Sequence, residues 1–486
     1  MSQEFDYYAL LGVTPDASPE EIREVFSTLR AAFPADEQDP ATNPAFQRIY
    51  NAYEVLSDPA RRETYDALLR ETTSAALTVD VKASRQEVEV SPNNQLFYLL
   101  VNVLPPPQSK PQRPLNLSLV IDRSTSMKGK RLNNVKTAVE LLVEQLTPED
   151  TLSVISFSDR AEVVAAAAPV RHKMPIVSRV RSIQASGGTE IYQGLYAGVK
   201  ELRKANLSNC VNQLILLTDG HTYGDAEQCL DLARQVTQEG IGFSAFGIGA
   251  EWNDHFLDAL VTPSGGQSGY IKEPAEIINY LQKRIKGLGA VYAQNVRLQN
   301  NFPASLMVQY GFKLQPFAQP LSLIGAHIEL GDVQSRAPLS FLLEINVKPQ
   351  PTETRITIPL TITAVTAHQA QEITIKKPFT LHVLAEVEKT LPPEELTEAV
   401  RALNMYRMNE KVWEDVEAGR LETAATRMHH LATRLLEAGQ TKLSQQALLE
   451  AERINQVGAI SLDGRKTLKY GTRTLINETI SLIPDE

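Results

Sequence analysis

The sequence predicts a multidomain chain built around an α/β domain, with helical segments at both ends and a β-sandwich beside that domain. From Leu115 onward, apolar strands alternate with amphipathic helices, which is the pattern of a mostly parallel sheet covered by helices on both faces. Residues 77–104 and 286–388 instead alternate at the two-residue period of β-strands. Residues 1–70 and 389–486 repeat apolar side chains at helical spacing.

Length, charge and cysteine content limit the classes of protein to consider. The chain has 486 residues, and one hydrophobic core rarely serves more than roughly 250–300, so several domains are expected. A net charge of −10 offers no overall basic face for nucleic acid. Cys210 and Cys229 are too few for a disulfide framework and lack metal-binding spacing, so we expect small buried side chains. Without a secretory signal or a spanning apolar run, we expect a cytoplasmic protein with no membrane partner.

The first 70 residues carry helix start signals. Ser18 can cap a helix, Pro19 suits its first position, and Glu21 completes a capping box. A second helix is predicted over Pro44–Leu56, with aromatic and aliphatic side chains on one face. This part of the chain is therefore predicted to be an all-α domain.

Residues 71–112 contain predicted strands without pairing partners in their own segment, followed by a proline-rich linker. The simplest assignment adds these strands to the sandwich of residues 286–388, which would make the α/β domain of residues 113–285 an insertion between sandwich strands. The last domain, residues 389–486, is predicted to be helical. Its expected helices are Leu396–Glu417, Leu421–Ala438 and Ser444–Ile454.

The α/β domain is predicted from four strands and four helices. The strands are Leu115–Ile121, Thr151–Phe157, Gln213–Thr218 and Gly242–Ile248. The helices are Arg131–Gln145, Ile191–Ala205, Asp225–Glu239 and Asp254–Leu260.

Five oxygen-bearing side chains follow these strands or lie in loops at the same edge of the sheet. They are Asp122, Ser124, Ser126, Thr189 and Asp219. Ligands bind at the carboxyl edge of such a sheet, so chain-distant segments can meet there. Two carboxylates and three hydroxyls are hard ligands, without His or Cys, and they favour Mg²⁺ over zinc, with Mn²⁺ or Ca²⁺ as alternatives.

Around these residues, residues 113–285 resemble a von Willebrand factor A (VWA) domain with a complete metal-ion-dependent adhesion site (MIDAS). The matching strings are Asp-Arg-Ser-Thr-Ser at 122–126, Ser-Gly-Gly-Thr-Glu at 186–190 and Thr-Asp-Gly at 218–220. The resemblance implies that Ser124 and Ser126 ligate the metal directly. It implies that Asp122 and Asp219 do so directly or through water, and that Thr189 completes the shell when a partner binds.

The charged residues near these strings leave two questions open. Arg123, Lys128, Lys130 and Arg131 either steer an acidic partner or form an ordinary solvated helix start. His221 is the best candidate for a general base, but an exposed loop histidine is the simpler interpretation. Because the sequence contains no nucleotide-binding, zinc-protease, hydrolase or kinase motif, we do not expect an enzyme.

Residues 5–70 resemble the J-domain of DnaJ-type cochaperones. The resemblance rests on Asp-Tyr-Tyr-Ala-Leu-Leu-Gly-Val at 6–13, Asn-Ala-Tyr-Glu-Val-Leu-Ser-Asp-Pro at 51–59, and Tyr-Asp at 65–66. The family's His-Pro-Asp loop falls on Pro34-Ala35-Asp36, where only the Asp is retained. The family presents a basic second helix to its ATPase. In this sequence, acidic residues offset the basic ones of that helix, with Glu20, Glu21 and Glu24 against Arg23 and Arg30. We therefore expect a degenerate J-like docking module.

Together these observations predict a non-enzymatic adaptor of bacterial type, which binds an Asp or Glu of a protein partner through Mg²⁺. The bacterial assignment rests on the resemblance of the sandwich and helical tail to bacterial VWA proteins. Two alternatives stay open. One is a J-domain cochaperone of a DnaK-type ATPase, and the other is a VWA subunit of a bacterial AAA+ or kinase/phosphatase signalling system.

Overall fold

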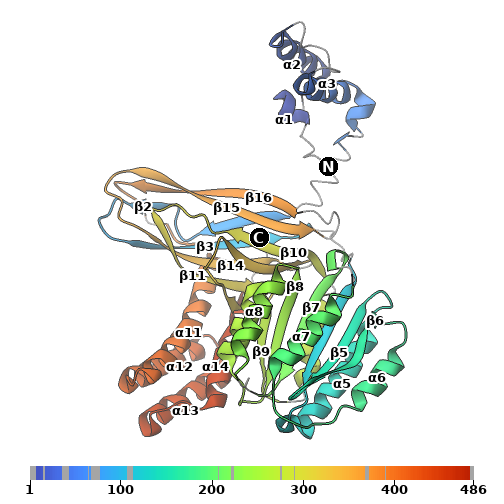
Figure 1. Cartoon of the computed structure of the whole chain (residues 1–486). Helices are drawn as coiled ribbons and strands as arrows, with labels where there is room; N and C mark the ends of the chain where they lie inside the picture. Colours follow the sequence, from blue (N-terminus) through green and yellow to red (C-terminus); the bar gives the residue numbers. More distant parts are fainter. Residues whose placement is uncertain are drawn as a thin grey trace. The chain divides into compact units, whose positions relative to one another are not determined.

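Figure 1 shows a computed structural model of the chain. The structure describes residues 7–14, 17–34, 43–63, 65–66, 77–106, 113–205, 207–220, 224–273, 276–288, 290–335, 337–366, 372–388 and 390–481. These residues fall into two compact units, Met1–Ala76 and Leu77–Glu486. Each unit is described by itself.

The first unit is helical, as predicted. Its helices are α1 (Tyr7–Leu11), α2 (Pro19–Ala31) and α3 (Pro44–Leu56). The capping box at Ser18 and Glu21 forms as expected, with both reciprocal hydrogen bonds present. Tyr8 donates a 2.6 Å hydrogen bond to Asp66, which joins the two ends of the unit.

The second unit contains a six-stranded sheet in the order β6-β5-β4-β7-β8-β9. The strands are β4 (Leu115–Asp122), β5 (Thr151–Phe157), β6 (Ala161–Pro169), β7 (Val211–Thr218), β8 (Ile241–Ile248) and β9 (Gln267–Ile271). All neighbours are parallel except β5 and β6. The sequence analysis found the four central strands and missed β6 and β9, the two edge strands.

Helices cover both faces of this sheet, as expected for an α/β domain (Figure 1). One face packs against α5 (Lys130–Gln145), α6 (Lys173–Arg181) and α10 (Ile277–Leu288). The other face packs against α7 (Ile191–Leu202), α8 (Ala226–Thr237) and α9 (Asp254–Val261). Short 3₁₀ helices occur at Thr125–Met127, Leu207–Asn209 and Thr262–Ser264.

The β-sandwich consists of two five-stranded sheets, β1-β3-β14-β11-β12 and β13-β10-β15-β16-β2, with an apolar core between them. The first sheet contains β1 (Thr78–Ala83), β3 (Gln95–Leu104), β11 (Leu306–Gln315), β12 (Gln319–Pro320) and β14 (Leu339–Val347). The second contains β2 (Glu87–Glu89), β10 (Val291–Gln299), β13 (His327–Gln334), β15 (Thr354–Thr366) and β16 (Glu372–Leu384).

The α/β domain is inserted into this sandwich. Strand β3 precedes the domain in sequence, yet nearly all of it, from Gln95 to Val103, pairs with β14, which follows the domain. Arg113, where the chain enters the α/β domain, donates a 3.1 Å hydrogen bond to Gln294, where the chain has left it. The orphan strands before the linker therefore lie in the sandwich.

The C-terminal helical domain has four helices in its described part, one more than the sequence analysis expected. They are α11 (Glu394–Glu417), α12 (Leu421–Glu437), α13 (Thr441–Val457) and α14 (Leu462–Ser481). Helix α14 was missed because glycines and basic residues interrupt the apolar pattern of its sequence. Lys466, Lys469 and Arg473 of α14 are nevertheless buried.

These buried cations join α14 to the α/β domain. Lys469 lies 2.7 Å from Asp254 and 2.8 Å from Asp258, both on α9. Arg473 lies 2.7 Å from the same Asp258. The helical domain also packs its apolar side chains on strands β3, β11 and β14 of the sandwich. Among the helices that the structure describes, none has the length and apolar character needed to cross a membrane.

Candidate functional site

The candidate site lies at the carboxyl edge of the six-stranded sheet, where β4 and β7 end side by side. The two strands are parallel neighbours, with Ile121 opposite Leu217. Asp122 is the last residue of β4, and Asp219 directly follows β7. Both carboxylates are therefore carried to one edge by strands that are almost fully buried.

Hydrogen bonds connect four of the five predicted residues. Ser126 Oγ donates to Asp219 Oδ1 at 2.7 Å, and Ser124 Oγ lies 3.0 Å from Ser126 Oγ. The backbone N–H of Ser124 donates to Asp122 Oδ1 at 2.8 Å, while Thr218 Oγ1 donates to Asp122 Oδ2 at 2.6 Å. These contacts gather carboxylate and hydroxyl oxygens from two segments that are almost a hundred positions apart in sequence.

The fifth residue, Thr189, is held beside this group by a glycine loop. A Cβ on Gly220 would lie 3.2 Å from Thr189 Oγ1, so the threonine hydroxyl contacts the residue that follows Asp219. Gly187 accepts a 3.1 Å hydrogen bond from the Thr125 backbone. Because Gly187 has a φ of +79° and a side chain there would collide with Asp159, the loop requires glycine at this position.

Asp122 is fully buried, and burial raises the pKa of its carboxyl group above the ordinary value. The hydrogen bonds from Ser124 and Thr218 act in the opposite direction, because they stabilise the charged form. The structure thus places a desolvated carboxylate where a nearby cation would be strongly favoured.

Arg131 is part of this site. The sequence analysis had left open whether it steers a partner or lies in a solvated helix start. Its guanidinium forms an ion pair with Asp219, whose side chain has no exposed surface, and it also donates to the Ser126 carbonyl at 3.3 Å. Gly249 leaves room for this arginine, since a Cβ there would lie 3.0 Å from the guanidinium. Arg131 is therefore not a freely solvated residue of the helix start.

The donor chemistry fits a hard divalent cation. Carboxylate and hydroxyl oxygens are typical ligands of Mg²⁺. Within the described residues, no group of three or more His, Cys, Asp and Glu side chains could hold a metal. A cation at this edge would therefore depend on hydroxyl ligands as well as on the two carboxylates. His221, the candidate base, lies outside the described residues.

Comparison with known proteins agrees with this architecture. Residues 116–283 match the family of the von Willebrand factor type A domain. A solved structure named von Willebrand factor type A from Catenulispora acidiphila superposes with a TM-score of 0.65 at 15% identity, covering 82% of this chain and 96% of that chain. The α/β domain has a VWA fold. Domains of this kind commonly bind a divalent metal.

The C-terminal helices match a family, and a curated protein is similar to part of the chain. Residues 394–478 match the family described as Sll0103-like, C-terminal alpha-helical domain. The uncharacterized protein sll0103 of Synechocystis is 34% identical over 186 residues, which make up 38% of this chain and 44% of that protein. The chain thus matches less than half of the length of this curated relative.

The helical unit at the start of the chain matches the DnaJ domain over residues 6–66. Chaperone protein DnaJ 2 of Streptomyces coelicolor is 50% identical over 62 residues, which are 13% of this chain and 16% of that protein. Pro34 is the last described residue after helix α2, whereas Ala35 and Asp36 lie outside the described residues. The structure therefore does not describe the loop that aligns with His-Pro-Asp.

Other sequence expectations had mixed outcomes. Cys229 is buried as expected, and burial raises the pKa of its thiol, but Cys210 is only half-buried.

The sequence analysis named the glycines at 187 and 188 only as part of a motif and gave them no role at the site. The structure adds their role, because the Gly188 N–H donates a 2.7 Å hydrogen bond to Asp159.

Proposed function

We propose that this protein is a non-enzymatic adaptor that binds an acidic residue of a protein partner through a divalent cation at the edge of its VWA domain. The observation that supports this proposal is the hydrogen-bonded cluster formed by Asp122, Ser124, Ser126 and Asp219. In this proposal the cluster is a MIDAS, and Thr189 is its fifth contributor. The presence of VWA and DnaJ domains indicates a protein-interaction or chaperone-associated role.

Each residue of the cluster has a distinct part in the proposal. Ser124 and Ser126 would supply hydroxyl ligands, and the buried Asp122 and Asp219 would supply negative charge. When bound, Mg²⁺ would offer an open coordination position to a partner's carboxylate. Arg131 would have to leave Asp219 or share it with the cation, because both are positive and use the same carboxylate.

The described part of the site favours binding over catalysis. The described residues of the site include no histidine that could act as a general base towards a serine hydroxyl. Ser126 Oγ donates to Asp219 Oδ1, and Arg131 pairs with Asp219 Oδ2, so both oxygens of this carboxylate already have partners. We therefore propose a site that holds a ligand without transforming it.

Calorimetric titration of the full chain with Mg²⁺ and with Mn²⁺ tests the cation site directly. We expect saturable binding by the wild type and its loss in Asp219→Ala and Asp122→Asn. Asp231→Ala is a matched control, because Asp231 is an exposed carboxylate on α8 of the same domain. Equal metal binding by the wild type and Asp219→Ala would refute the assignment.

A pull-down from bacterial lysate, in Mg²⁺ and in EDTA, tests the adaptor role. Partners that depend on the metal bridge should be lost in EDTA and lost again in Asp219→Ala, but retained by Asp231→Ala. If a partner stays bound in EDTA, its contact with this chain does not use the cation. If the chain binds the metal but retains all of its partners in EDTA, the assignment of the cation site stands and the metal bridge to a partner is disproved.

For the J-like unit we propose docking without stimulation of a DnaK-type ATPase. The basis is the sequence Pro34-Ala35-Asp36 and the acidic start of α2, where Glu20 already pairs with Arg23 at 3.6 Å. We expect the full chain to leave the ATPase rate of DnaK unchanged. The double substitution Pro34→His and Ala35→Pro should alter this little, because the acidic face would remain. Stimulation by the wild-type chain would favour the cochaperone alternative.

A further inference from the structure

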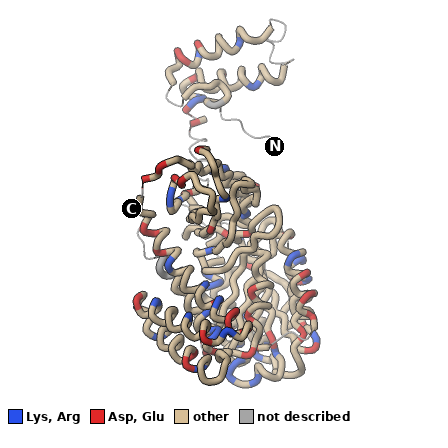
Figure 2. The backbone as a smooth tube through the Cα atoms, turned by 90° about the vertical axis from the view of Figure 1, so that its left-hand side faces the viewer, with Lys and Arg blue, Asp and Glu red and all other residues tan. Residues whose placement is uncertain are grey.

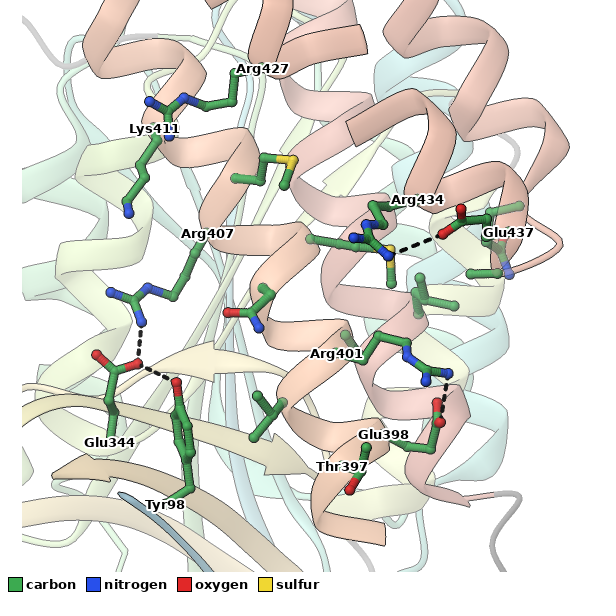
Figure 3. A pocket seen from close by; sticks show the side chains of 18 of the residues that line it. Tyr98, Glu344, Thr397, Glu398, Arg401, Arg407, Lys411, Arg427, Arg434 and Glu437 are labelled. Carbon is green, nitrogen blue, oxygen red and sulfur yellow. Dashed lines mark hydrogen bonds and ion pairs between the residues drawn. The ribbon is translucent and has the colours of Figure 1, made fainter. Parts of the chain in front are cut away.

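A second candidate binding site lies on the C-terminal helical domain, and none of the residues that line it belongs to the metal edge. It is an open pocket of about 1240 Å³ between α11, α12 and the sandwich strands β3 and β14. Drug-sized ligands occupy pockets of roughly 300–1,000 Å³, so this groove suits a longer segment. Figure 3 shows its charged side chains arranged around the opening.

Cations dominate the lining of this groove. Five basic residues line it, against three carboxylates, although the whole chain carries a net charge of −10. The basic residues are Arg401, Arg407, Lys411, Arg427 and Arg434. They come from both helices, so that cations lie on two sides of the groove (Figure 3). Figure 2 shows that over the backbone as a whole Lys and Arg are interspersed with Asp and Glu.

The arginines already hold carboxylates of the chain itself. Arg401 lies 2.7 Å from Glu398, and Arg434 lies 3.3 Å from Glu437, and each of these residues is three positions from its partner. These two exposed pairs contribute roughly 0–1 kcal/mol, so an incoming carboxylate can replace them at little cost. Arg407 and Arg427 instead pair with Glu344 and Asp415, whose side chains are nearly buried. Lys411 has no carboxylate within ion-pair distance among the described residues, so it keeps its charge available.

Apolar side chains form the surface between these cations. Val400 and Met408 of α11 are partly buried, and Leu96 of β3 is exposed to 39%. Methionine adapts to irregular apolar surfaces, which suits it to a binding groove. The groove thus combines an apolar strip with flanking positive charge.

We propose that this groove binds an acidic, amphipathic segment of a protein partner, with its carboxylates on the arginines and its apolar side chains on the strip. Guanidinium groups match planar carboxylates in pairs of hydrogen bonds, which favours Asp and Glu as the recognised groups. The binding uses none of the residues at the metal edge. It is therefore a metal-independent contact, separate from the proposed cation bridge.

Fluorescence anisotropy with the full chain in EDTA tests the proposal. The probe is a labelled helical peptide with Glu on one face and Leu on the other, and the reference peptide carries Gln in place of Glu. We expect the Glu peptide to bind, with affinity falling as salt rises, and the Gln peptide to bind about tenfold or more weakly. Equal affinity for the two peptides would overturn the proposal.

Charge reversal locates the site on the chain. The double variant Arg401→Glu and Lys411→Glu, at two exposed positions of α11, should weaken the Glu peptide at least about tenfold, since two charged contacts become repulsive. The matched control, Lys442→Glu with Arg453→Glu, makes the same charge change at exposed positions of α13 outside the groove. Circular dichroism verifies that both variants are folded.

Each outcome decides the question. If the groove variant and the control bind the peptide equally, the groove is not the site. If a phosphorylated peptide or an oligonucleotide binds and the Glu peptide does not, the groove recognises phosphate and the proposal fails. Because all arms contain EDTA, and because Asp219→Ala should bind the Glu peptide as the wild type does, failure of the cation bridge leaves this result unaffected.

Discussion

Replacing Asp258 by Asn removes the carboxylate that joins α9 of the VWA domain to two cations of α14. Asp258 lies 2.8 Å from Lys469 and 2.7 Å from Arg473. The side chains of these cations are 1% and 4% exposed, so water cannot replace the lost carboxylate. Lys469 keeps Asp254 as a partner, whereas Arg473 keeps only neutral acceptors such as Gln319 and Tyr406.

The expected cost follows from this burial. Breaking a buried ion pair by removing one partner typically destabilises a protein by about 3–5 kcal/mol. Asp258 itself is 17% exposed, and Lys469 is not orphaned, so we expect a loss near the lower end, about 3 kcal/mol. The loss should appear first as separation of α14 from the VWA domain, because the contact crosses that interface.

Urea unfolding followed by tryptophan fluorescence measures this effect. Trp252 lies 5.8 Å from the ring of Tyr470 on α14, and the other tryptophan, Trp413, contacts Arg465 of α14, so the emission of both reports the contacts of α14. Asp231→Asn serves as a control, because its pair with Arg234 has side chains that are 66% and 59% exposed. The control should change stability by less than about 1 kcal/mol. If Asp258→Asn also stayed within about 0.5 kcal/mol of the wild type, the reasoning from burial would be wrong.

The same residue predicts a pH dependence. Burial alone would raise the pKa of Asp258, but Arg473 and Lys469 outweigh it and hold that pKa well below its usual range. A carboxylate with a depressed folded pKa stabilises the protein fully above its unfolded pKa, near about 4. That stabilisation is lost as pH falls through the folded pKa. The wild type should therefore lose stability below about pH 4 more steeply than Asp258→Asn.

Three further changes test separate parts of the structure. Arg131→Gln removes the cation paired with Asp219 and should tighten Mg²⁺ binding about tenfold in calorimetric titration; weaker binding would show that Arg131 assists the metal. Gly194→Ala places a Cβ 2.6 Å from Phe157 and should lower the free energy of unfolding by about 1–3 kcal/mol, and an unchanged thermal midpoint would contradict this packing. Burial lowers the pKa of Lys313 well below its usual range, and the charge of Arg284 lowers it further. Because the unfolded chain then binds more protons than the folded one, wild-type stability should rise from pH 7 towards pH 10. Lys313→Met should flatten that rise. Parallel pH profiles for the two proteins would exclude this role for Lys313.

The sequence predicted the parts of the fold that have regular patterns. The central strands β4, β5, β7 and β8 are mostly apolar, so their burial on both faces could be predicted from composition. The edge strand β6 has exposed positions along much of its length, and helix α14 hides its cations in an interface. Neither pattern can be recognised without the partner that each element packs against.

The candidate site shows the same division. The convergence of Asp122 and Asp219 followed from the rule that parallel strands end at one sheet edge. The pairing of Arg131 with Asp219 did not follow, because it depends on the room left by Gly249, more than a hundred positions away. The basic groove was also unreadable, since its cations come from two helices whose relative placement is set by tertiary packing.

The insertion of the VWA domain into the sandwich sets an order for folding during synthesis. Tyr98 of β3 bonds to Glu344 of β14, and these residues are 246 positions apart. Closing so long a loop in an unfolded chain costs about 5 kcal/mol of entropy. A folded VWA domain shortens that loop, because the chain enters it at Arg113 and leaves it next to Gln294 of β10, and these two residues are joined by a hydrogen bond. Strands β1 and β3 leave the ribosome long before β14, so we expect the inserted domain to fold first and then to bring together the two parts of the sandwich.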